Sequence, residues 1–400
     1  MVTIESLTHL GLGRASDGQS LLPRVLPGEE VTVAQDGTLR IVTPSTDRVA
    51  PPCRHFKTCG GCAMQHANDD FVATWKQDIV EKALRARGLA PEFRPITTSP
   101  AQSRRRAKLS GRRTKKGAMV GFHAKASDTL VAVPDCQLLT PRLLGSFTAL
   151  EALTVIACSR KGEIDLTVTD TDLGPDVLVG TDKELTPQLR IELAAFAQQH
   201  GLARLVWNDE PVVTLNAPVQ DFGGTAVVPP PGAFLQATKH GELALLDAVE
   251  DATASARHIV DLFAGCGTFT LPLAKRAEVH AVEGESAMLQ ALDYGWRDGH
   301  QLRRVTTETR DLFRRPLEPD ELRRYDTAVI DPPRAGAEAQ IATLAASDIK
   351  TIAMVSCNPV TFARDARILV DAGFTVNWVQ VVDQFRWSPH VELVAAITRK

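Results

Sequence analysis

The sequence predicts an α/β fold in which a mostly parallel sheet, covered by helices, occupies the C-terminal part of the chain. Two patterns predict it. After residue 231, apolar runs of strand length alternate with segments of helix length, whereas the first fifty residues hold only short runs broken by glycine and proline. A chain of 400 residues is also too long to fold around one ordinary hydrophobic core, and its hydrophobic content of 44% is that of a globular protein. We therefore expect three regions, at residues 1–51, 52–230 and 231–400.

Residues 1–51 alternate apolar and polar side chains in short runs, which is typical of a small β-barrel, and the pair Pro51–Pro52 marks its end. A cysteine-rich turn and a helix over residues 69–88 follow. The rest of the central region is predicted to be β-rich, with strands at residues 117–122, 129–133, 164–168, 202–207 and 212–215 and helices near 143–153 and 187–200. In the C-terminal region we expect strands at residues 258–263, 278–283, 327–331, 351–356, 375–382 and 391–397.

Net charge gives no global sign of a nucleic-acid-binding protein, because the formal charge is −3 and the pI is near 6.4. One local segment differs. Arg104–Lys116 holds eight lysines and arginines and no acidic residue, so it is either a solvated loop or a segment that holds phosphates. No apolar run has the length of a membrane span and the first residues do not form a signal peptide, so we expect a cytoplasmic location.

A turn between a strand and a helix, Asp261–Thr268, carries glycines that let the backbone approach a ligand closely. Glu283 and Asp331 end two later strands. Ligands of open α/β sheets bind at such strand ends, although both acids could instead cap helices. Two prolines directly after Asp331 stiffen that exit and favour a binding role.

Cys357 lies between the predicted strand at residues 351–356 and a predicted helix that begins near Pro359. The positive end of a helix dipole lowers the pKa of a nearby thiol, so this position predicts a reactive cysteine. The alternative is a small buried apolar residue, which is common for free cysteine.

Three further cysteines, Cys53, Cys59 and Cys62, stand within ten residues and could bind one metal centre. Cys136, in a turn after a strand, is the best fourth ligand. Spacing alone leaves zinc, an iron–sulfur cluster and unmetallated thiols open. Cys158 and Cys266 are interpreted as inert core residues.

Together these segments resemble the uridine-C5 RNA methyltransferases, and within them the branch with an N-terminal TRAM domain and an iron–sulfur cluster that methylates 23S ribosomal RNA. The resemblance rests on motifs along the whole C-terminal region: DLFAGCGTFTLPL from Asp261, VEG from Val282, DPPRAG from Asp331, VSCNP from Val355 with ARD from Ala363, and HVE from His390. It implies a Rossmann-like S-adenosylmethionine-dependent methyltransferase domain, a TRAM/OB-like barrel at residues 1–51 and an RNA-binding central region.

The resemblance also implies roles for individual residues. The donor, S-adenosyl-L-methionine, would contact Gln236, Phe263, Thr268, Glu283, Asp311 and Asp331. This chain departs from the family at Thr268 and Thr238, where asparagine is usual, but a hydroxyl can also hydrogen-bond the donor. Cys53, Cys59, Cys62 and Cys136 would hold a [4Fe-4S] cluster with a structural or RNA-positioning role.

Carbon methylation explains the need for a nucleophilic thiol. C5 of uracil becomes nucleophilic only after a group adds to C6, and a base must then remove the C5 proton. The resemblance assigns the addition to Cys357 and the proton to Glu392, with Asp383 and Asp365 as rival bases by position.

The RNA substrate is the least determined part of the interpretation. Ribosomal RNA is favoured, and a transfer RNA methyltransferase that acts on the T-loop is the first alternative. An inactive RNA-binding scaffold is the second, and the set Cys357, Glu392 and Asp331 argues against it. RNA specificity resides in loops and shape, so the sequence does not specify the target uridine.

Overall fold

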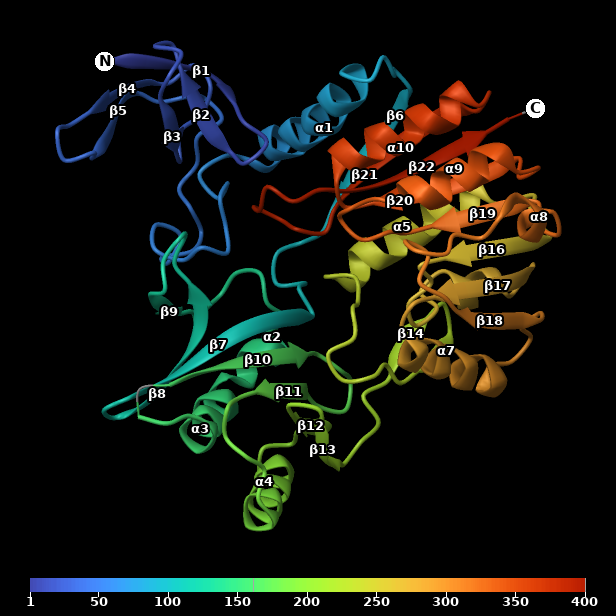
Figure 1. Ribbon diagram of the computed structural model, residues 1–400. Coiled ribbons are helices and arrows are strands. Elements are labelled where there is room, and N and C mark those ends of the chain that lie inside the picture. The colour runs from blue at the N-terminus through green and yellow to red at the C-terminus, as the bar shows by residue number, and fades with distance from the viewer. Residues whose placement is uncertain (161, 400) are drawn as a thin grey trace.

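The computed structural model describes residues 1–160 and 162–399, so residue 400 of the predicted C-terminal region lies outside it. Three main sheets follow one another along the chain (Figure 1). The first is antiparallel, with strand order β3-β2-β1-β4-β5, and forms an open half-barrel. Its strands are β1 (Val2–Leu7), β2 (Leu12–Ala15), β3 (Leu21–Pro23), β4 (Glu30–Val33) and β5 (Leu39–Thr43).

Glu29 joins the half-barrel to the segment that follows β5. Its side chain is fully buried and accepts hydrogen bonds from Arg48 Nε at 2.5 Å and Arg48 Nη2 at 2.8 Å. The backbone N–H groups of Leu26 and Ser45 donate to the same carboxylate. A buried carboxylate with four donors keeps its charge, so the pKa of Glu29 is lowered although burial opposes the change.

The central sheet has seven strands in the order β13-β12-β11-β10-β7-β8-β9, with helices packed on it. Its strands are β7 (Arg106–Thr114), β8 (Gly117–His123), β9 (Leu130–Ala132), β10 (Glu163–Thr169), β11 (Asp176–Gly180), β12 (Arg204–Trp207) and β13 (Glu210–Thr214). Its helices are α2 (Pro141–Gly145), α3 (Phe147–Ala157) and α4 (Pro187–Gln199). The single helix predicted over residues 143–153 is therefore two helices, which meet at Ser146.

The C-terminal sheet has eight strands in the order β18-β17-β16-β19-β20-β22-β21-β6. The strands are β6 (Glu92–Thr98), β16 (His258–Leu262), β17 (Glu278–Glu283), β18 (Val305–Thr309), β19 (Thr327–Ile330), β20 (Thr351–Ser356), β21 (Thr375–Asp383) and β22 (Glu392–Thr398). The five strands from β18 to β20 are mutually parallel, and β22 inserts antiparallel between β20 and β21. A short hairpin, β14 (Gln220–Phe222) and β15 (Thr225–Val227), precedes this region.

Helices cover both faces of the C-terminal sheet, as expected for strands with apolar side chains on both sides (Figure 1). One face carries α1 (Asp69–Arg85), α8 (Pro319–Leu322), α9 (Glu338–Ala346) and α10 (Pro359–Asp371). The other carries α5 (Lys239–Ala252), α6 (Thr270–Leu273) and α7 (Ser286–Asp298). The predicted α/β class is confirmed, with a mostly parallel C-terminal sheet and a β-rich central region. The small β-barrel predicted for residues 1–51 is an open half-barrel.

Two elements of the C-terminal sheet come from earlier in the chain than predicted. Strand β6 pairs in parallel with β21, and α1 packs against α10, although both lie within residues 52–230. The division of the chain at residue 231 stays a prediction, but the sheet extends across it. No helix in the described part of the chain is long and apolar enough to cross a membrane.

A buried ion pair joins α1 to the C-terminal end of the sheet. Lys76 is fully buried, and its Nζ lies 2.5 Å from Asp383 Oδ1. The same ammonium donates to the backbone carbonyls of Phe385 and His390, each at 3.0 Å. Residues 384–391, called the β21–β22 loop below, are thus held near both ends by one side chain.

We predict that Lys76→Met lowers the free energy of unfolding by about 3–5 kcal/mol, because the variant leaves Asp383 charged and unpaired in the interior. Urea unfolding followed by circular dichroism measures the change. Lys82→Met on the same helix is the matched control, since Lys82 pairs with Asp78 at an exposed site and should contribute less than about 1 kcal/mol. Equal decreases in the free energy of unfolding of the two variants would show that the buried ion pair stabilises the fold no more than the exposed one.

Candidate active site

The parallel strands β16, β17, β18 and β19 end at one edge of the sheet, and most of the donor contacts implied by the family resemblance lie in the loops that follow them. Phe263 follows β16, Glu283 ends β17, Asp311 follows β18 and Asp331 follows β19. Because β18 was not among the predicted strands, spacing alone could not place Asp311 here. Only the motif resemblance indicates Asp311 as a candidate donor contact.

The turn after β16 is shaped by residues in the left-handed region of backbone space. Phe263 has φ +63°, Gly265 φ +57° and Gly267 φ +93°. A Cβ on Gly267 would lie 2.9 Å from the side chain of Leu292, so the turn packs closely on α7. Thr268 is in the same turn and is partly exposed.

The carboxylate of Glu283 is held by backbone donors. Gly265 N donates to Oε2 at 3.0 Å, while Gly284 N and Glu285 N donate to Oε1 at 2.7 and 3.0 Å. These bonds join the end of β17 to the glycine turn after β16, and none of them goes to a residue of α7. The carboxylate has further lone pairs for a ligand hydroxyl.

Two aromatic rings lie near this edge. Phe263 and Phe313 pack with their centroids 5.4 Å apart, and the Phe313 side chain is 49% exposed. Asp311 Oδ1 accepts from Phe313 N at 3.0 Å and fixes the turn that presents the second ring. The pair forms an apolar surface beside Glu283, suited to a flat ring.

Asp331 and Gln236 meet on the other side of the glycine turn. Gln236 lies in the segment before α5, is buried, and donates from Nε2 to Asp331 Oδ2 at 3.4 Å. Burial raises the pKa of Asp331 to about 7. Asp261, fully buried beneath them, accepts from Thr270 Oγ1, and burial raises its pKa to about 7 as well.

Cys357 and Glu392 face one another at the end of the antiparallel pair β20 and β22. Ser356 at the end of β20 pairs with Leu393 of β22. If this antiparallel register is continued by one residue, Cys357, which follows Ser356, lies opposite Glu392, which precedes Leu393. Cys357 is partly buried and precedes α10, as predicted. Glu392 is 3% exposed and is the first residue of β22.

The expected low pKa of Cys357 is wrong for the protein without its substrates. Burial raises the pKa of this thiol to about 11, and the charges of Glu392 and Asp331 add to the rise, while Arg334 opposes it. The dipole of α10 does not overcome two carboxylates in a poorly hydrated site. The thiol therefore needs a partner that takes its proton.

Burial also raises the pKa of Glu392 to about 8, with a further contribution from Asp331. Gln384 Nε2 donates to Glu392 Oε2 at 3.0 Å and favours its charged form. The rival bases are engaged elsewhere: Asp383 pairs with Lys76, and Asp365 accepts from Ala337 N and pairs with Arg364. Among the three acids, only Glu392 adjoins Cys357 in the strand register.

The four predicted cluster cysteines approach one another between the half-barrel and the central sheet. Burial raises the pKa of Cys62 to about 12, and the charges of Cys136, Cys59 and Cys53 contribute to that rise. Backbone N–H groups donate to two sulfurs, from Gly61 to Cys59 and from Leu138 to Cys136. In the described residues, no three His, Cys, Asp or Glu side chains are grouped to hold a metal ion, so the cluster stays a prediction.

The cysteine segment also contacts the β21–β22 loop. The carbonyl oxygen of Trp387 accepts from Ala63 N at 2.7 Å and Met64 N at 3.0 Å, directly after Cys62. Trp387 is 6% exposed, has φ +59°, and packs into the core of the central sheet. The region around the cysteines is therefore joined to the loop that leads into Glu392.

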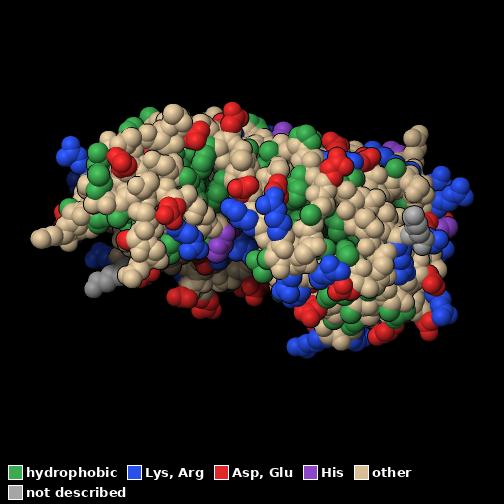
Figure 2. Space-filling model, turned by 90° about the horizontal axis from the view of Figure 1, so that it is seen from above, with side chains coloured by type: hydrophobic (Ala, Val, Ile, Leu, Met, Phe, Trp, Pro, Cys, Tyr) green, Lys and Arg blue, Asp and Glu red, His purple; other side chains and the backbone are tan. Residues whose placement is uncertain are grey.

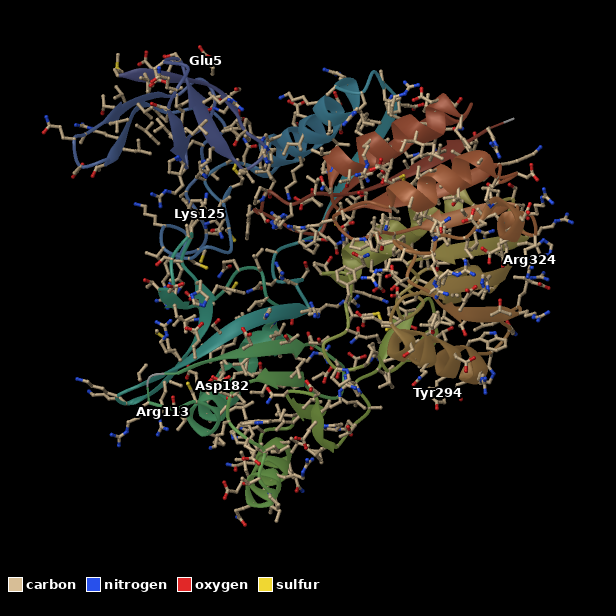
Figure 3. All side chains as sticks on the ribbon, in the orientation of Figure 1. Glu5, Arg113, Lys125, Asp182, Tyr294 and Arg324 are labelled. Carbon is tan, nitrogen blue, oxygen red and sulfur yellow. The ribbon has the colours of Figure 1, made fainter. Side chains whose placement is uncertain are left out.

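The basic segment Arg104–Lys116 is not one continuous phosphate-binding surface. Arg105 is buried, pairs with Glu242 and donates to Gln236 O, while Arg106 donates to Gly232 O. The exposed cations of the segment are Lys108, Lys115 and Lys116, and Arg113 is partly exposed at the β7–β8 hairpin (Figure 3). Seen from above, lysines and arginines are mixed with acidic side chains over the molecule (Figure 2).

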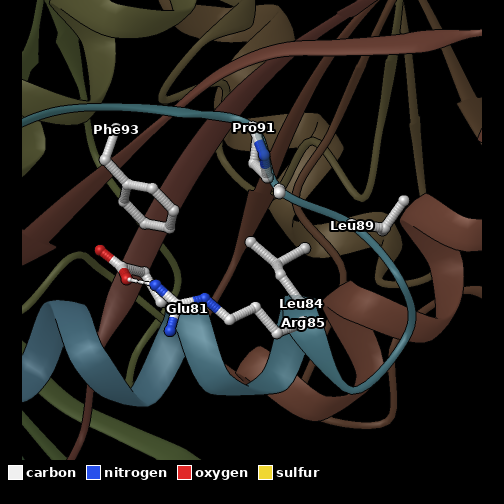
Figure 4. A pocket seen from close by; sticks show the side chains of 7 residues that line it. Glu81, Leu84, Arg85, Leu89, Pro91 and Phe93 are labelled. Carbon is white, nitrogen blue, oxygen red and sulfur yellow. Dashed lines mark hydrogen bonds and ion pairs between the residues drawn. The ribbon is translucent and has the colours of Figure 1, made fainter.

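Two pockets help to locate open surface. One of about 290 Å³ lies between the end of α1 and β6, where Arg85 pairs with Glu81, and holds no predicted site residue (Figure 4). Another, of about 440 Å³, is lined by the half-barrel, by Cys59 and Cys62, and by Lys125 of the β8–β9 loop. The second pocket places three parts of the chain around one hollow beside the cysteines.

Comparison with known proteins identifies relatives along the whole chain. Residues 229–400 match the tRNA (Uracil-5-)-methyltransferase family. A protein of Mesorhizobium japonicum named as an uncharacterized RNA methyltransferase is 42% identical over 97% of this chain and 95% of its own length. The 23S rRNA (uracil(1939)-C(5))-methyltransferase RlmD of Alkalilimnicola ehrlichii is 32% identical over 100% of this chain and 96% of its own length.

A solved structure agrees with the fold. The tRNA (uracil-54, C5)-methyltransferase of Pyrococcus abyssi, in complex with S-adenosyl-L-homocysteine, superposes with a TM-score of 0.78 and covers 100% of both chains. At 20% identity this likeness shows the arrangement of the three sheets and their helices.

Proposed function

The chain belongs to the RNA uracil-C5 methyltransferase family, and we propose that it transfers a methyl group from S-adenosylmethionine to C5 of a specific uridine in 23S ribosomal RNA. One observation carries the proposal: a thiol and a buried carboxylate, Cys357 and Glu392, lie opposite each other beside Asp331. Carbon methylation of a pyrimidine needs a nucleophile and a base in this relation.

In the first step, Cys357 Sγ forms a bond to C6 of the uracil, and the electrons of the C5–C6 double bond move toward C5 and O4. Because the pKa of Cys357 is about 11, the thiol passes its proton to a neighbouring carboxylate as this bond forms. Asp331, with a pKa of about 7, is the group that carries charge near neutral pH. C5 then attacks the methyl carbon, whose bond to the donor's sulfur breaks.

In the second step, Glu392 takes the proton from C5. The electrons of the C5–H bond restore the C5–C6 double bond, and the bond from C6 to Cys357 Sγ breaks with its electrons on sulfur. The thiolate then takes back the proton that Asp331 accepted in the first step. Only charged Glu392 can accept the C5 proton. Since the pKa of Glu392 in the free protein is about 8, kcat/KM should rise with pH through that value.

The donor is proposed to bind along the edge formed by β16 to β19. Glu283 would accept the ribose hydroxyls, and the rings of Phe263 and Phe313 would cover the adenine. Gln236, Thr268, Asp311 and Asp331 line the same edge and complete the proposed contacts. The sulfonium charge of the donor is matched by the carboxylates of this region.

A [4Fe-4S] cluster held by Cys53, Cys59, Cys62 and Cys136 is the second part of the proposal. Two observations support this donor set: the charges of Cys53, Cys59 and Cys136 all act on Cys62, and two of the sulfurs accept backbone hydrogen bonds of the kind that stabilise cluster sulfurs. Arg104 lies beside Cys62 and Cys136, where its charge offsets that of the thiolates. When bound, the cluster would supply a rigid cross-link rather than redox chemistry, because methyl transfer consumes no electron.

The proposal of 23S ribosomal RNA is supported by the relative from Alkalilimnicola ehrlichii, which is similar along the whole chain. The half-barrel and the cysteine segment frame an open hollow with Arg24, Lys57 and Lys125 on its rim. Such a basic hollow suits the phosphates of an RNA whose target base is flipped into the active site.

RNA that carries 5-fluorouridine tests the chemistry. In 5-fluorouridine, fluorine replaces the hydrogen on C5, so after methyl transfer the base has no C5 proton to remove. The protein should therefore stay bonded to C6 and migrate with the RNA in denaturing gels. We predict that Cys357→Ala abolishes the adduct and that Cys158→Ala, a change at a cysteine outside the site, retains it. An adduct that persists without Cys357 would contradict the proposed nucleophile.

Metal analysis tests the cluster. Protein purified without oxygen should contain about four iron and four acid-labile sulfide per chain and absorb visible light. Cys136→Ser should lose most of both, whereas Cys158→Ser should keep them. A chain that binds one zinc and no iron would overturn the assignment.

A further inference from the structure

Gln384, the first residue of the β21–β22 loop, connects the proposed base to a proposed donor contact. Its Nε2 donates to Gln236 Oε1 at 2.5 Å and to Glu392 Oε2 at 3.0 Å. Its Oε1 accepts from Ala237 N at 2.7 Å. The side chain is 2% exposed, so these contacts form away from bulk water. No motif in the sequence had singled this residue out.

The position of Gln384 is fixed from two directions. On one side Lys76 holds its neighbours, through Asp383 and the carbonyls of Phe385 and His390. On the other side the first turn of α5 leaves room for it at Gly241, where an added Cβ would lie 2.6 Å from Gln384 Cβ. The side chain is therefore closely fitted between the loop and the helix.

The hydrogen bonds extend to a second carboxylate. Gln236 uses its Oε1 to accept from Gln384 and its Nε2 to donate to Asp331 Oδ2 at 3.4 Å. A continuous chain of hydrogen bonds thus runs from the buried Glu392 through the buried Gln384 and Gln236 to the partly buried Asp331. Only an amide side chain at position 384 can make all three hydrogen bonds, because it must accept from Ala237 N and donate to the side-chain oxygens of Gln236 and Glu392.

We propose that Gln384 is a positioning residue for proton abstraction, which orients Glu392 toward C5 and couples it to the donor contact Gln236. The inference rests on the proposed function, in which Glu392 is the base. Gln384 touches neither reacting atom. It acts on the second step, in which the C5 proton moves to Glu392 and the bond from C6 to Cys357 breaks.

The charges around Glu392 set the direction of the pH effect. Asp331 raises the pKa of Glu392, while Gln384 and Arg334 lower it. Cys357, the other titratable group that faces Glu392, is a neutral thiol below its pKa of about 11. Without the hydrogen bond from Gln384, the pKa of Glu392 rises further, so a higher pH is needed to charge the base.

Gln384→Met tests the inference because methionine keeps the length of the side chain and removes the amide. Methyl transfer in a single turnover should change less than about threefold, while steady-state turnover should fall at least about tenfold. Natural RNA should then accumulate as a methylated covalent adduct, and the pH profile should shift to higher pH. The KM of the donor should rise less than kcat falls.

Gln380→Met is the matched control, because Gln380 lies on β21, the strand that leads into Gln384, and bonds Thr97 at 3.1 Å, away from Glu392. Gln384→Glu is the second variant, which keeps the shape and should accumulate the adduct in the same way. Circular dichroism and thermal unfolding confirm that each variant is folded.

Three outcomes decide the inference. A folded Gln384→Met or Gln384→Glu protein that turns over at the wild-type rate, with an unshifted pH profile and no adduct, overturns it. Equal loss of methyl transfer and turnover also overturns it, because the residue would then serve the whole site. If the wild type itself forms no adduct with 5-fluorouridine RNA, the proposed function has failed instead.

Discussion

The buried ammonium group of Lys76 fixes the conformation of the β21–β22 loop. It pairs with Asp383 and two carbonyls of the β21–β22 loop, and so joins a helix near residue 76 to a loop more than three hundred residues later. A charge taken out of water is tolerated only where its partners are complete. The position of the loop, and with it those of Gln384 and Glu392, follows from this requirement.

The sheet supplies the second constraint. Parallel strands bring the ends of β16, β17, β18 and β19 to one edge, which collects the proposed donor contacts. Strand β22, inserted antiparallel beside β20, starts at this edge and places Glu392 against Cys357. Three acidic groups then share a poorly hydrated space, and each keeps its proton more firmly than it would in water.

Local patterns predicted the elements whose signal lies within a few residues. The strands at 278–283 and 351–356 were predicted with their observed bounds, because each is an apolar run with clear ends. Strand β6 was missed because it pairs with β21, and nothing near Glu92 indicates that partner. Lys76 and Arg105 resemble surface cations in sequence, since their buried acids, Asp383 and Glu242, lie far along the chain. The raised pKa of Cys357 likewise depends on carboxylates that only folding brings near.

The proposed substrate is a uridine of 23S ribosomal RNA. Mass spectrometry of 5-methyluridine in ribosomal and transfer RNA, from cells with and without the gene, tests this proposal. We expect one 5-methyluridine of 23S ribosomal RNA to disappear without the gene and to return with the wild-type protein but not with Cys357→Ala. Loss of the modification from the T-loop of transfer RNA, with ribosomal RNA unchanged, would contradict it.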